Sequence, residues 1–123
     1  MNSVVALDVG GTLMKGAVVD RDGTARAVEQ RPTLRQPDTV EGILAFAADL
    51  VASAGSPAAV GLAVPGIVDE VRGVARYSSN LGWRDLPLRD IATDRLAVPG
   101  GLDARRAGRR GGRARVRCGT RGR

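Results

Sequence analysis

The chain of 123 residues contains no histidine, so it offers neither a histidine general base nor a histidine metal ligand. Its one cysteine, Cys118, excludes an internal disulfide and a zinc site built from several cysteines. Aromatic residues are limited to Phe46, Tyr77 and Trp83. No apolar run reaches 18 residues, and no basic stretch precedes an apolar one near the N-terminus. The sequence therefore predicts a cytoplasmic protein with no membrane partner, long enough for one domain with its own core.

Acidic residues are almost absent from the C-terminal segment, and this explains the positive charge of the chain. Residues 100–123 contain nine arginines and a single acid, Asp103, which gives a net charge of +8. Residues 1–99 contain ten basic and twelve acidic residues, which gives a net charge of −2. The body of the chain therefore gives no indication of a nucleic-acid partner.

Large aliphatic side chains are also scarce in residues 100–123, where arginine and glycine recur without a period. Such a segment buries too little apolar surface to offset the entropy of ordering it, so we expect disorder. The composition upstream suggests a G+C-rich gene, in which a one-base shift yields arginine and glycine. We therefore hypothesise that the reading frame is lost near residue 99 or 100. The alternative is a genuine Arg/Gly-rich tail that binds nucleic-acid phosphates, although it has no aromatic residue to stack on bases.

Residues 6–15 carry the clearest chemistry in the chain. An apolar strand ends in the carboxylate of Asp8, Gly10 and Gly11 turn the backbone, and Thr12 precedes a second apolar strand. Backbone N–H groups at glycines can approach an anionic oxygen closely, and the Thr12 hydroxyl adds a donor. A carboxylate at a strand end suits Mg²⁺, which keeps several waters and takes one or two carboxylates. The glycine spacing fits neither a P-loop nor a dinucleotide fingerprint, and the alternative interpretation is an ordinary hairpin with a Gly-Gly turn.

The rest of the first 99 residues alternates between predicted strands and helices. Strands are expected over 4–9, 13–19, 24–30 and 58–64, a short hairpin over 67–76, helices over 38–54 and 87–97, and a further strand from 98. The first three strands read as an antiparallel meander, because residues 20–23 form a strong turn signal. Residues 77–83 are polar and irregular, as in a binding loop. This order predicts an α/β domain with a mixed sheet.

Three motifs follow one another along the chain: residues 8–15, residues 64–69 (V-P-G-I-V-D) and residues 79–83 (S-N-L-G-W). Together they resemble the ROK family of sugar kinases and related repressors, which has the actin-like/hexokinase-like ATPase (ribonuclease-H-like) fold. The resemblance covers residues 1–99, as an incomplete N-terminal domain, and leaves 100–123 outside it. It implies a glucokinase-like enzyme that transfers a phosphoryl group from ATP to a hexose hydroxyl.

On the phosphate side, the resemblance implies a role for each matching residue. Asp8 would organise Mg²⁺ and its waters, and Gly10, Gly11 and Thr12 would cradle the phosphates of ATP. Lys15 would add positive charge near the phosphates, or else be a solvated strand residue. The implied cofactors are therefore ATP and Mg²⁺.

On the sugar side, Gly66 would let the backbone approach a sugar hydroxyl, unless it serves only a Pro-Gly turn. Asn80 would offer its amide to a pair of sugar hydroxyls, or else cap a turn. Trp83 reads as a packing residue rather than as a platform for a sugar. The resemblance thus implies a nucleotide and a hexose as partners, and homo-oligomers for full-length members of the family.

The chain also departs from the family pattern. The family's base is an Asp in an Asn-Asp segment, but Asp103 lacks the preceding Asn and lies too close to Pro99, so we assign no catalytic residue. The family's Cys-rich zinc segment and second lobe are missing as well, and we expect the chain itself to be inactive because phosphoryl transfer needs both sides of the cleft. A fragment of a ROK repressor, which binds sugar without phosphorylating it, is the first alternative; a module built around the tail is the second. The identity of the sugar and the choice between ATP and polyphosphate stay open.

Overall fold

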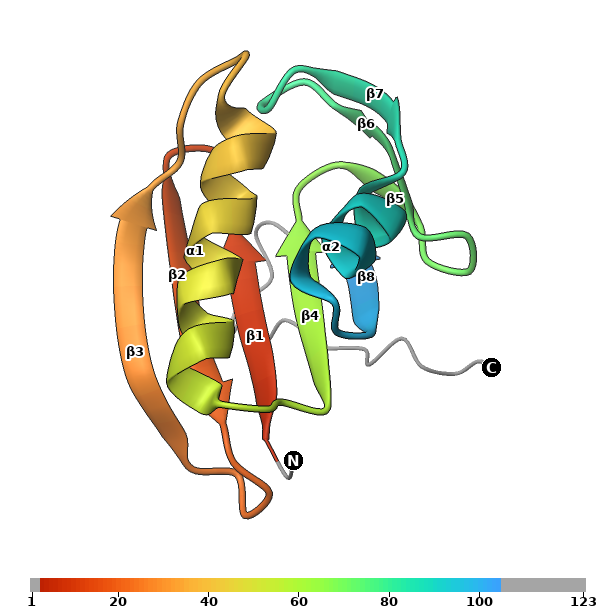
Figure 1. The fold of residues 1–123 in the computed structure, drawn as a ribbon. Coiled ribbons are helices and arrows are strands. Elements are labelled where there is room, and N and C mark those ends of the chain that lie inside the picture. Colours follow the sequence, from red (N-terminus) through yellow and green to blue (C-terminus); the bar gives the residue numbers. More distant parts are fainter. Residues whose placement is uncertain (1–2, 105–123) are drawn as a thin grey trace.

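The computed structural model describes residues 3–104, and its centre is a five-stranded mixed sheet (Figure 1). The strands are β1 (Val4–Val9), β2 (Leu13–Val19), β3 (Ala25–Pro32), β4 (Ala59–Val64) and β8 (Gly100–Ala104), in the order β3-β2-β1-β4-β8. β1, β2 and β3 pair antiparallel, which confirms the predicted meander, and β4 pairs parallel with β1 and with β8. The carboxyl ends of β1, β4 and β8 therefore lie at the same end of the sheet, which is where α/β sheets bind ligands.

Helix α1 (Thr39–Ala54) packs against β1 and β2, as its apolar periodicity predicts. Its buried side chains are Thr39, Ile43, Leu44, Phe46, Ala47 and Leu50. Gly16 on β2 allows the helix to approach the sheet closely, since a Cβ at this position would lie 2.6 Å from Leu50 Cδ1 and 3.0 Å from Phe46 Cζ. The helix ends where the sequence predicts, because Gly55 takes a positive φ of 89° and its N–H donates to the Val51 carbonyl at 3.0 Å.

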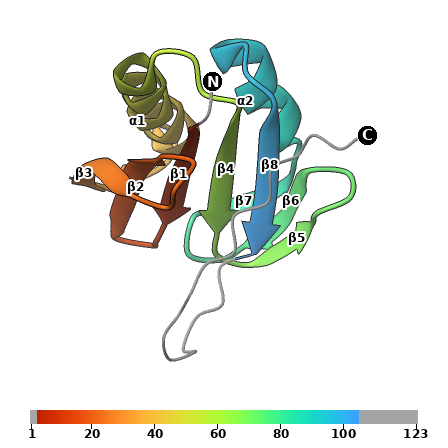
Figure 2. The same ribbon diagram turned by 90° about the horizontal axis from the view of Figure 1, so that it is seen from below.

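Helix α2 (Leu88–Leu96) lies beside α1, and Figure 2 shows both helices on the same side of the five-stranded sheet. Leu88 and Ala92 anchor α2 in the core. Arg95 joins the two helices through two hydrogen bonds of 3.0 Å to the Glu41 carboxylate. These hydrogen bonds hold the pKa of Glu41 below its usual value. The second predicted helix is thus confirmed.

A second sheet follows β4 and consists of β5 (Ile67–Asp69), β6 (Val74–Ser78) and β7 (Trp83–Leu86), all antiparallel. The predicted hairpin over residues 67–76 corresponds to β5 and β6. The expectation of an irregular segment over 77–83 is wrong at both ends, because β6 continues to Ser78 and β7 begins at Trp83. Only residues 79–82 form the turn between them. Trp83 is 6% exposed and belongs to the hydrophobic core, which confirms its interpretation as a packing residue.

The edge of the main sheet differs from the sequence expectation. Residues 100–123 were predicted to lie outside the folded domain, whereas Gly100–Ala104 form β8, paired parallel with β4 from Val60 to Val64. Residues 105–123, which include the rest of the predicted tail and Cys118, lie outside the described residues. Within the part of the chain that the structure describes, neither helix is long and apolar enough to cross a membrane.

Candidate functional site

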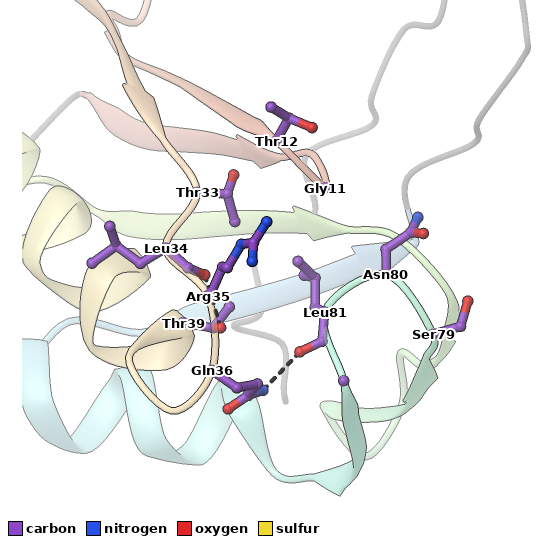
Figure 3. Close-up of a pocket in the computed structure, with 11 residues that line it drawn as sticks. Gly11, Thr12, Thr33, Leu34, Arg35, Gln36, Thr39, Ser79, Asn80 and Leu81 are labelled. Atoms are coloured by element: carbon purple, nitrogen blue, oxygen red, sulfur yellow. Dashed lines mark hydrogen bonds between the residues drawn. The ribbon is translucent and has the colours of Figure 1, made fainter.

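A pocket of about 420 Å³ opens beyond the carboxyl end of β1 (Figure 3). Three segments that are distant in the sequence line it. The first is the tip of the β1–β2 hairpin, Gly11 and Thr12; the second is the β3–α1 loop, residues 33–36, together with Thr39, the first residue of α1; the third is the β6–β7 turn, residues 79–82. Sites for small molecules have volumes of about 300–1,000 Å³, so the pocket has the size of one.

Thr33 fixes the β3–α1 loop to the hairpin. Its N–H donates to the Thr12 carbonyl at 2.9 Å, and its Oγ1 donates to the Gly10 carbonyl, also at 2.9 Å. At the other end of the loop, Thr39 Oγ1 donates to the Leu34 carbonyl at 2.9 Å. Both ends of this wall are therefore held by hydrogen bonds.

Gln36 joins the same loop to the β6–β7 turn. Its Nε2 donates to the Leu81 carbonyl at 2.7 Å, the dashed line of Figure 3. Within the turn, the Leu81 N–H donates to Ser78 Oγ at 3.2 Å, and the Gly82 N–H donates to the Ser78 carbonyl at 2.8 Å. The three walls thus form one hydrogen-bonded frame, and a site of this kind loses little entropy when a ligand binds.

The two glycines of the hairpin have different roles. The Gly10 N–H donates to the Leu13 carbonyl at 2.9 Å, and a Cβ on Gly10 would lie 2.8 Å from the same oxygen, so the tight hairpin requires this glycine. A Cβ on Gly11 would meet only Asn80, whose Cβ would lie at an ordinary contact distance of 3.5 Å. The fold therefore brings the two predicted site residues Gly11 and Asn80 together, and it could accommodate a methyl group at Gly11 at ordinary contact distance.

Because Gly10 is required by the hairpin and Gly11 is not, substitutions at the two positions are expected to affect stability and nucleotide binding differently. Gly11→Ala is expected to preserve the thermal unfolding transition to within about 1 kcal/mol. It is expected to weaken binding of Mg²⁺ and the ATP analogue AMPPNP by about tenfold or more, because the methyl group fills the space through which a phosphate oxygen reaches the backbone N–H groups. Calorimetric titration and thermal melting measure the two effects. Gly10→Ala is the contrasting variant and should lower stability; unchanged nucleotide binding by Gly11→Ala would contradict this role.

Asp8 and Lys15 lie near the pocket but do not line it. They are paired in the β1–β2 register, on the face of the sheet away from α1, with Asp8 half-buried and Lys15 exposed. The side chains that the structure describes, those of residues 3–101, include no group of three or more His, Cys, Asp or Glu arranged to hold a metal ion. A single carboxylate suits an ion that keeps most of its waters, as Mg²⁺ does. The donor set therefore fits a water-mediated Mg²⁺ at Asp8, and it does not fit an ion enclosed by the protein.

Gly66 lies outside the pocket lining and has a structural role of its own. Its φ is 104°, and a Cβ would collide with the Tyr77 carbonyl oxygen and lie 3.0 Å from Ser78 Cα. The turn after β4 therefore requires glycine at this position, as the Pro-Gly turn interpretation expects. The carboxylates of Asp22 and Asp69 have a local role in turns: Asp22 Oδ1 accepts from the Thr24 N–H at 2.9 Å, and Asp69 Oδ1 accepts from the Arg72 N–H at 3.1 Å.

The sequence interpretation missed the β3–α1 loop. Thr33, Arg35 and Gln36 line the pocket, although the sequence analysis assigns no role to the residues between the predicted strand 24–30 and the predicted helix 38–54. No motif marks them, and their position depends on the pairing of β3 with β2 and on the contact between Gln36 and the β6–β7 turn. Both are long-range features that a local pattern does not show.

Comparison with known protein families matches residues 4–104 to the ROK family. The chain belongs to the ROK family. A glucokinase from Streptomyces coelicolor is 27% identical over 99 residues, which are 80% of this chain and 31% of that protein. The chain thus spans about a third of the length of the curated glucokinase that it matches. The family match includes β8, so it extends beyond the residue at which the resemblance was expected to end.

Solved structures support the same assignment. A ROK family glucokinase from Streptomyces griseus, determined in complex with glucose and AMPPNP, superimposes with a TM-score of 0.71 at 30% identity, over 83% of this chain and 33% of that one. A ROK family transcriptional regulator, a homologue of the E. coli MLC protein, has a TM-score of 0.73 at 12% identity over 83% and 27%, a likeness of fold alone. The predicted fold class is therefore confirmed: this is part of an actin-like ATPase fold, a mixed sheet with an antiparallel meander and helices.

Proposed function

We propose that this chain is the N-terminal part of an ATP-dependent, glucokinase-like sugar kinase that transfers a phosphoryl group from ATP to a hexose hydroxyl. The observation that carries the proposal is the proximity of Gly11 and Asn80, because a Cβ on Gly11 would lie 3.5 Å from Asn80 Cβ. Gly11 belongs to the motif that the family uses for phosphate, and Asn80 to the one that it uses for sugar. Donor and acceptor would therefore meet in one pocket, as direct transfer between them requires.

The hairpin would bind the phosphates of ATP. The glycines at its tip present backbone N–H groups, the Thr12 side chain adds a hydroxyl, and both Gly11 and Thr12 are exposed at the pocket. Asp8 would hold Mg²⁺ through water, and Lys15 would add positive charge on the same face of the sheet. An Mg²⁺ ion held there would supply positive charge to offset the negative charge that develops on the phosphate oxygens during transfer.

The sugar would lie next to the phosphates, at Asn80 in the β6–β7 turn. Asn80 is exposed there and offers both a donor and an acceptor to neighbouring hydroxyls. Gly66 would present backbone to the same sugar from the turn after β4. Glucose is the first hexose to test, since the glucokinases that resemble this chain act on it by name.

No general base is proposed from this chain. None of the residues that line the pocket is a carboxylate or a histidine, and a base must lie within hydrogen-bond reach of the hydroxyl that it activates. The 123-residue chain is therefore expected to bind Mg²⁺ and nucleotide weakly and to phosphorylate no hexose above background.

The gene sequence tests the hypothesis that the reading frame is lost, at a point that the family match through residue 104 moves from residue 99 or 100 to beyond residue 104. Reading on in a frame shifted by one base is expected to add roughly two hundred residues, about the length of a second domain. The added sequence should contain an Asn-Asp pair near its start and a Cys-rich segment later. Stop codons soon after the shift in both alternative frames would contradict the hypothesis and favour a genuine Arg/Gly-rich tail.

The enzyme assay then separates the kinase from the repressor. The frame-restored chain is expected to form glucose phosphate from glucose and ATP in the presence of Mg²⁺. Saturable glucose binding without glucose phosphate would contradict the kinase proposal and favour a ROK repressor. Phosphoryl transfer from polyphosphate but not from ATP would contradict ATP as the donor and would still support the hexose site.

A further inference from the structure

Arg35 differs from most arginines of the described chain in its lack of partners. Residues 3–104 contain seven arginines with a hydrogen bond, ion pair or ring contact: Arg26, Arg31, Arg72, Arg76, Arg84, Arg89 and Arg95. The side chain of Arg35 has none of these among the described residues, and nor does that of Arg21; the one hydrogen bond of Arg35 is made by its backbone carbonyl, which accepts from the Asp38 N–H at 2.9 Å. Arg21 lies in the exposed turn between β2 and β3, at the end of the sheet away from the pocket.

The guanidinium of Arg35 lies within the pocket. Figure 3 shows its side chain extending from the β3–α1 loop into the space between Thr33 and Leu81, with the guanidinium toward the hairpin tip at Gly11. The loop that carries it is fixed on both sides of Arg35, by Thr33 to the hairpin and by Gln36 to the β6–β7 turn. The backbone that carries this cation is therefore fixed by the frame of the pocket.

The pocket lining suits an anionic ligand that also carries hydroxyl groups. Besides Arg35 it contains the hydroxyl or amide side chains of Thr12, Thr33, Gln36, Ser79 and Asn80, and no carboxylate. A guanidinium offers several donors in a planar fork that matches a phosphate group, and it carries its charge at every pH that the protein meets. Because no carboxylate lines the pocket and Arg35 forms no ion pair with the described residues, its charge is available to a ligand.

We propose that Arg35 binds a phosphate group in this pocket, from the side opposite the N–H groups of the hairpin. This inference rests on the proposed function, since it adds a binding residue to the same site. The phosphate has two possible sources with the same chemistry: the terminal phosphate of the nucleotide, or the phosphate of the hexose phosphate product. Arg35 would hold either one beside Asn80, where donor and sugar meet.

The test uses the complete 123-residue chain and three ligands: AMPPNP with Mg²⁺, glucose 6-phosphate and glucose. Binding is measured by calorimetry and by the fluorescence of Trp83, the only tryptophan, which directly follows the pocket residue Gly82. The variants are Arg35→Gln, Arg35→Lys and, as the matched control, Arg21→Gln, which removes the same charge from a distant turn. Titrations at about 0.15 M salt screen exposed charges, and the arginine-rich C-terminal segment is common to all variants.

Arg35→Gln is expected to weaken binding of at least one phosphate ligand by about tenfold, the effect of losing a charge-assisted hydrogen bond. Arg35→Lys should retain only part of the lost affinity. Arg21→Gln should change the affinity for either phosphate ligand by less than about twofold, and Arg35→Gln should change the affinity for glucose by less than about twofold. A loss confined to AMPPNP identifies the donor phosphate, and a loss confined to glucose 6-phosphate identifies the product phosphate. Equal effects of Arg35→Gln and Arg21→Gln, or no binding of either phosphate ligand by the wild type, would overturn the proposal.

The same titrations separate this proposal from the proposed function. If AMPPNP binding requires Asp8 and Mg²⁺ but neither AMPPNP nor glucose 6-phosphate binding depends on Arg35, the kinase proposal stands and the role of Arg35 is refuted. If Arg35 is needed for glucose 6-phosphate while AMPPNP does not bind, the role of Arg35 stands and the use of ATP by this chain is refuted.

Discussion

Replacing Asp8 by alanine is expected to lower hexose phosphorylation by the frame-restored chain by about 100-fold or more, because charge stabilisation at the transferred phosphoryl group is the main contribution that a kinase makes. Asp8 is half-buried at the end of β1, two residues before the hairpin that carries Gly10 and Gly11. It is the carboxylate that suits a water-mediated Mg²⁺ beside the hairpin, since the side chains described for residues 3–101 include no group of three or more His, Cys, Asp or Glu that could hold the ion instead. The initial rate of hexose phosphate formation at saturating ATP and Mg²⁺ measures the effect.

Two further variants make the result specific to the metal site. Asp8→Asn keeps the size of the side chain and removes its charge, so it should lose nearly as much activity as Asp8→Ala. Asp94→Ala removes an exposed carboxylate from α2 and should leave the rate unchanged. The carboxylate of Asp94 forms no hydrogen bond or ion pair with the described residues. Full activity of Asp8→Asn would show that the charge of Asp8 is not needed and would contradict the assignment.

Gly66→Ala is expected to lower the free energy of unfolding by about 3 kcal/mol or more, the combined effect of a strained φ and an overpacked contact. Gly66 has a φ of 104°, and a Cβ there would collide with the Tyr77 carbonyl oxygen in β6. The colliding atom belongs to the backbone of a paired strand, so it cannot move aside as the end of a flexible side chain would. Urea denaturation of the two proteins gives the difference directly.

Gly55→Ala is the matched control for this loss. Gly55 has a similar φ of 89°, but a Cβ there would meet nothing within 4 Å. It should therefore show only the conformational penalty, about 1 kcal/mol. Equal losses in the two variants would contradict the collision with Tyr77 and leave the backbone conformation as the only requirement for glycine.

The elements that the sequence predicts best are those defined by local patterns. Helix α1 has an apolar stripe at the helical period and Gly55 at its end, and the β1–β2–β3 meander has apolar strands with clear turns between them. β8 is different: its sequence G-G-L-D-A contains two glycines and one large apolar residue, which gives little local preference for a strand. Its pairing with β4 joins distant parts of the chain, which a local pattern does not show. Because the prediction used composition alone, it assigned residues 100–104 to the Arg/Gly-rich tail.

The same distinction applies to the site. Gly11 and Asn80 stand in short motifs, and the pocket brings these two predicted residues together. Arg35 and Gln36 stand in no motif; they reach the pocket because β3 pairs with β2 and because Gln36 donates to the Leu81 carbonyl. Sequence patterns thus identify residues whose role depends on the local backbone, and they miss residues such as Arg35 and Gln36 that only the tertiary structure brings to the pocket.

The most direct test of the central claim is a calorimetric titration of the 123-residue chain with AMPPNP, in Mg²⁺ and again in EDTA, repeated with Asp8→Ala and Asp94→Ala. The claim is that the β1–β2 hairpin and Asp8 form a nucleotide-phosphate site that needs Mg²⁺. It predicts weak, saturable binding in Mg²⁺ by the wild type and by Asp94→Ala, with binding lost in EDTA and in Asp8→Ala. Binding that is the same in EDTA and in Asp8→Ala as in the wild type with Mg²⁺ would contradict it.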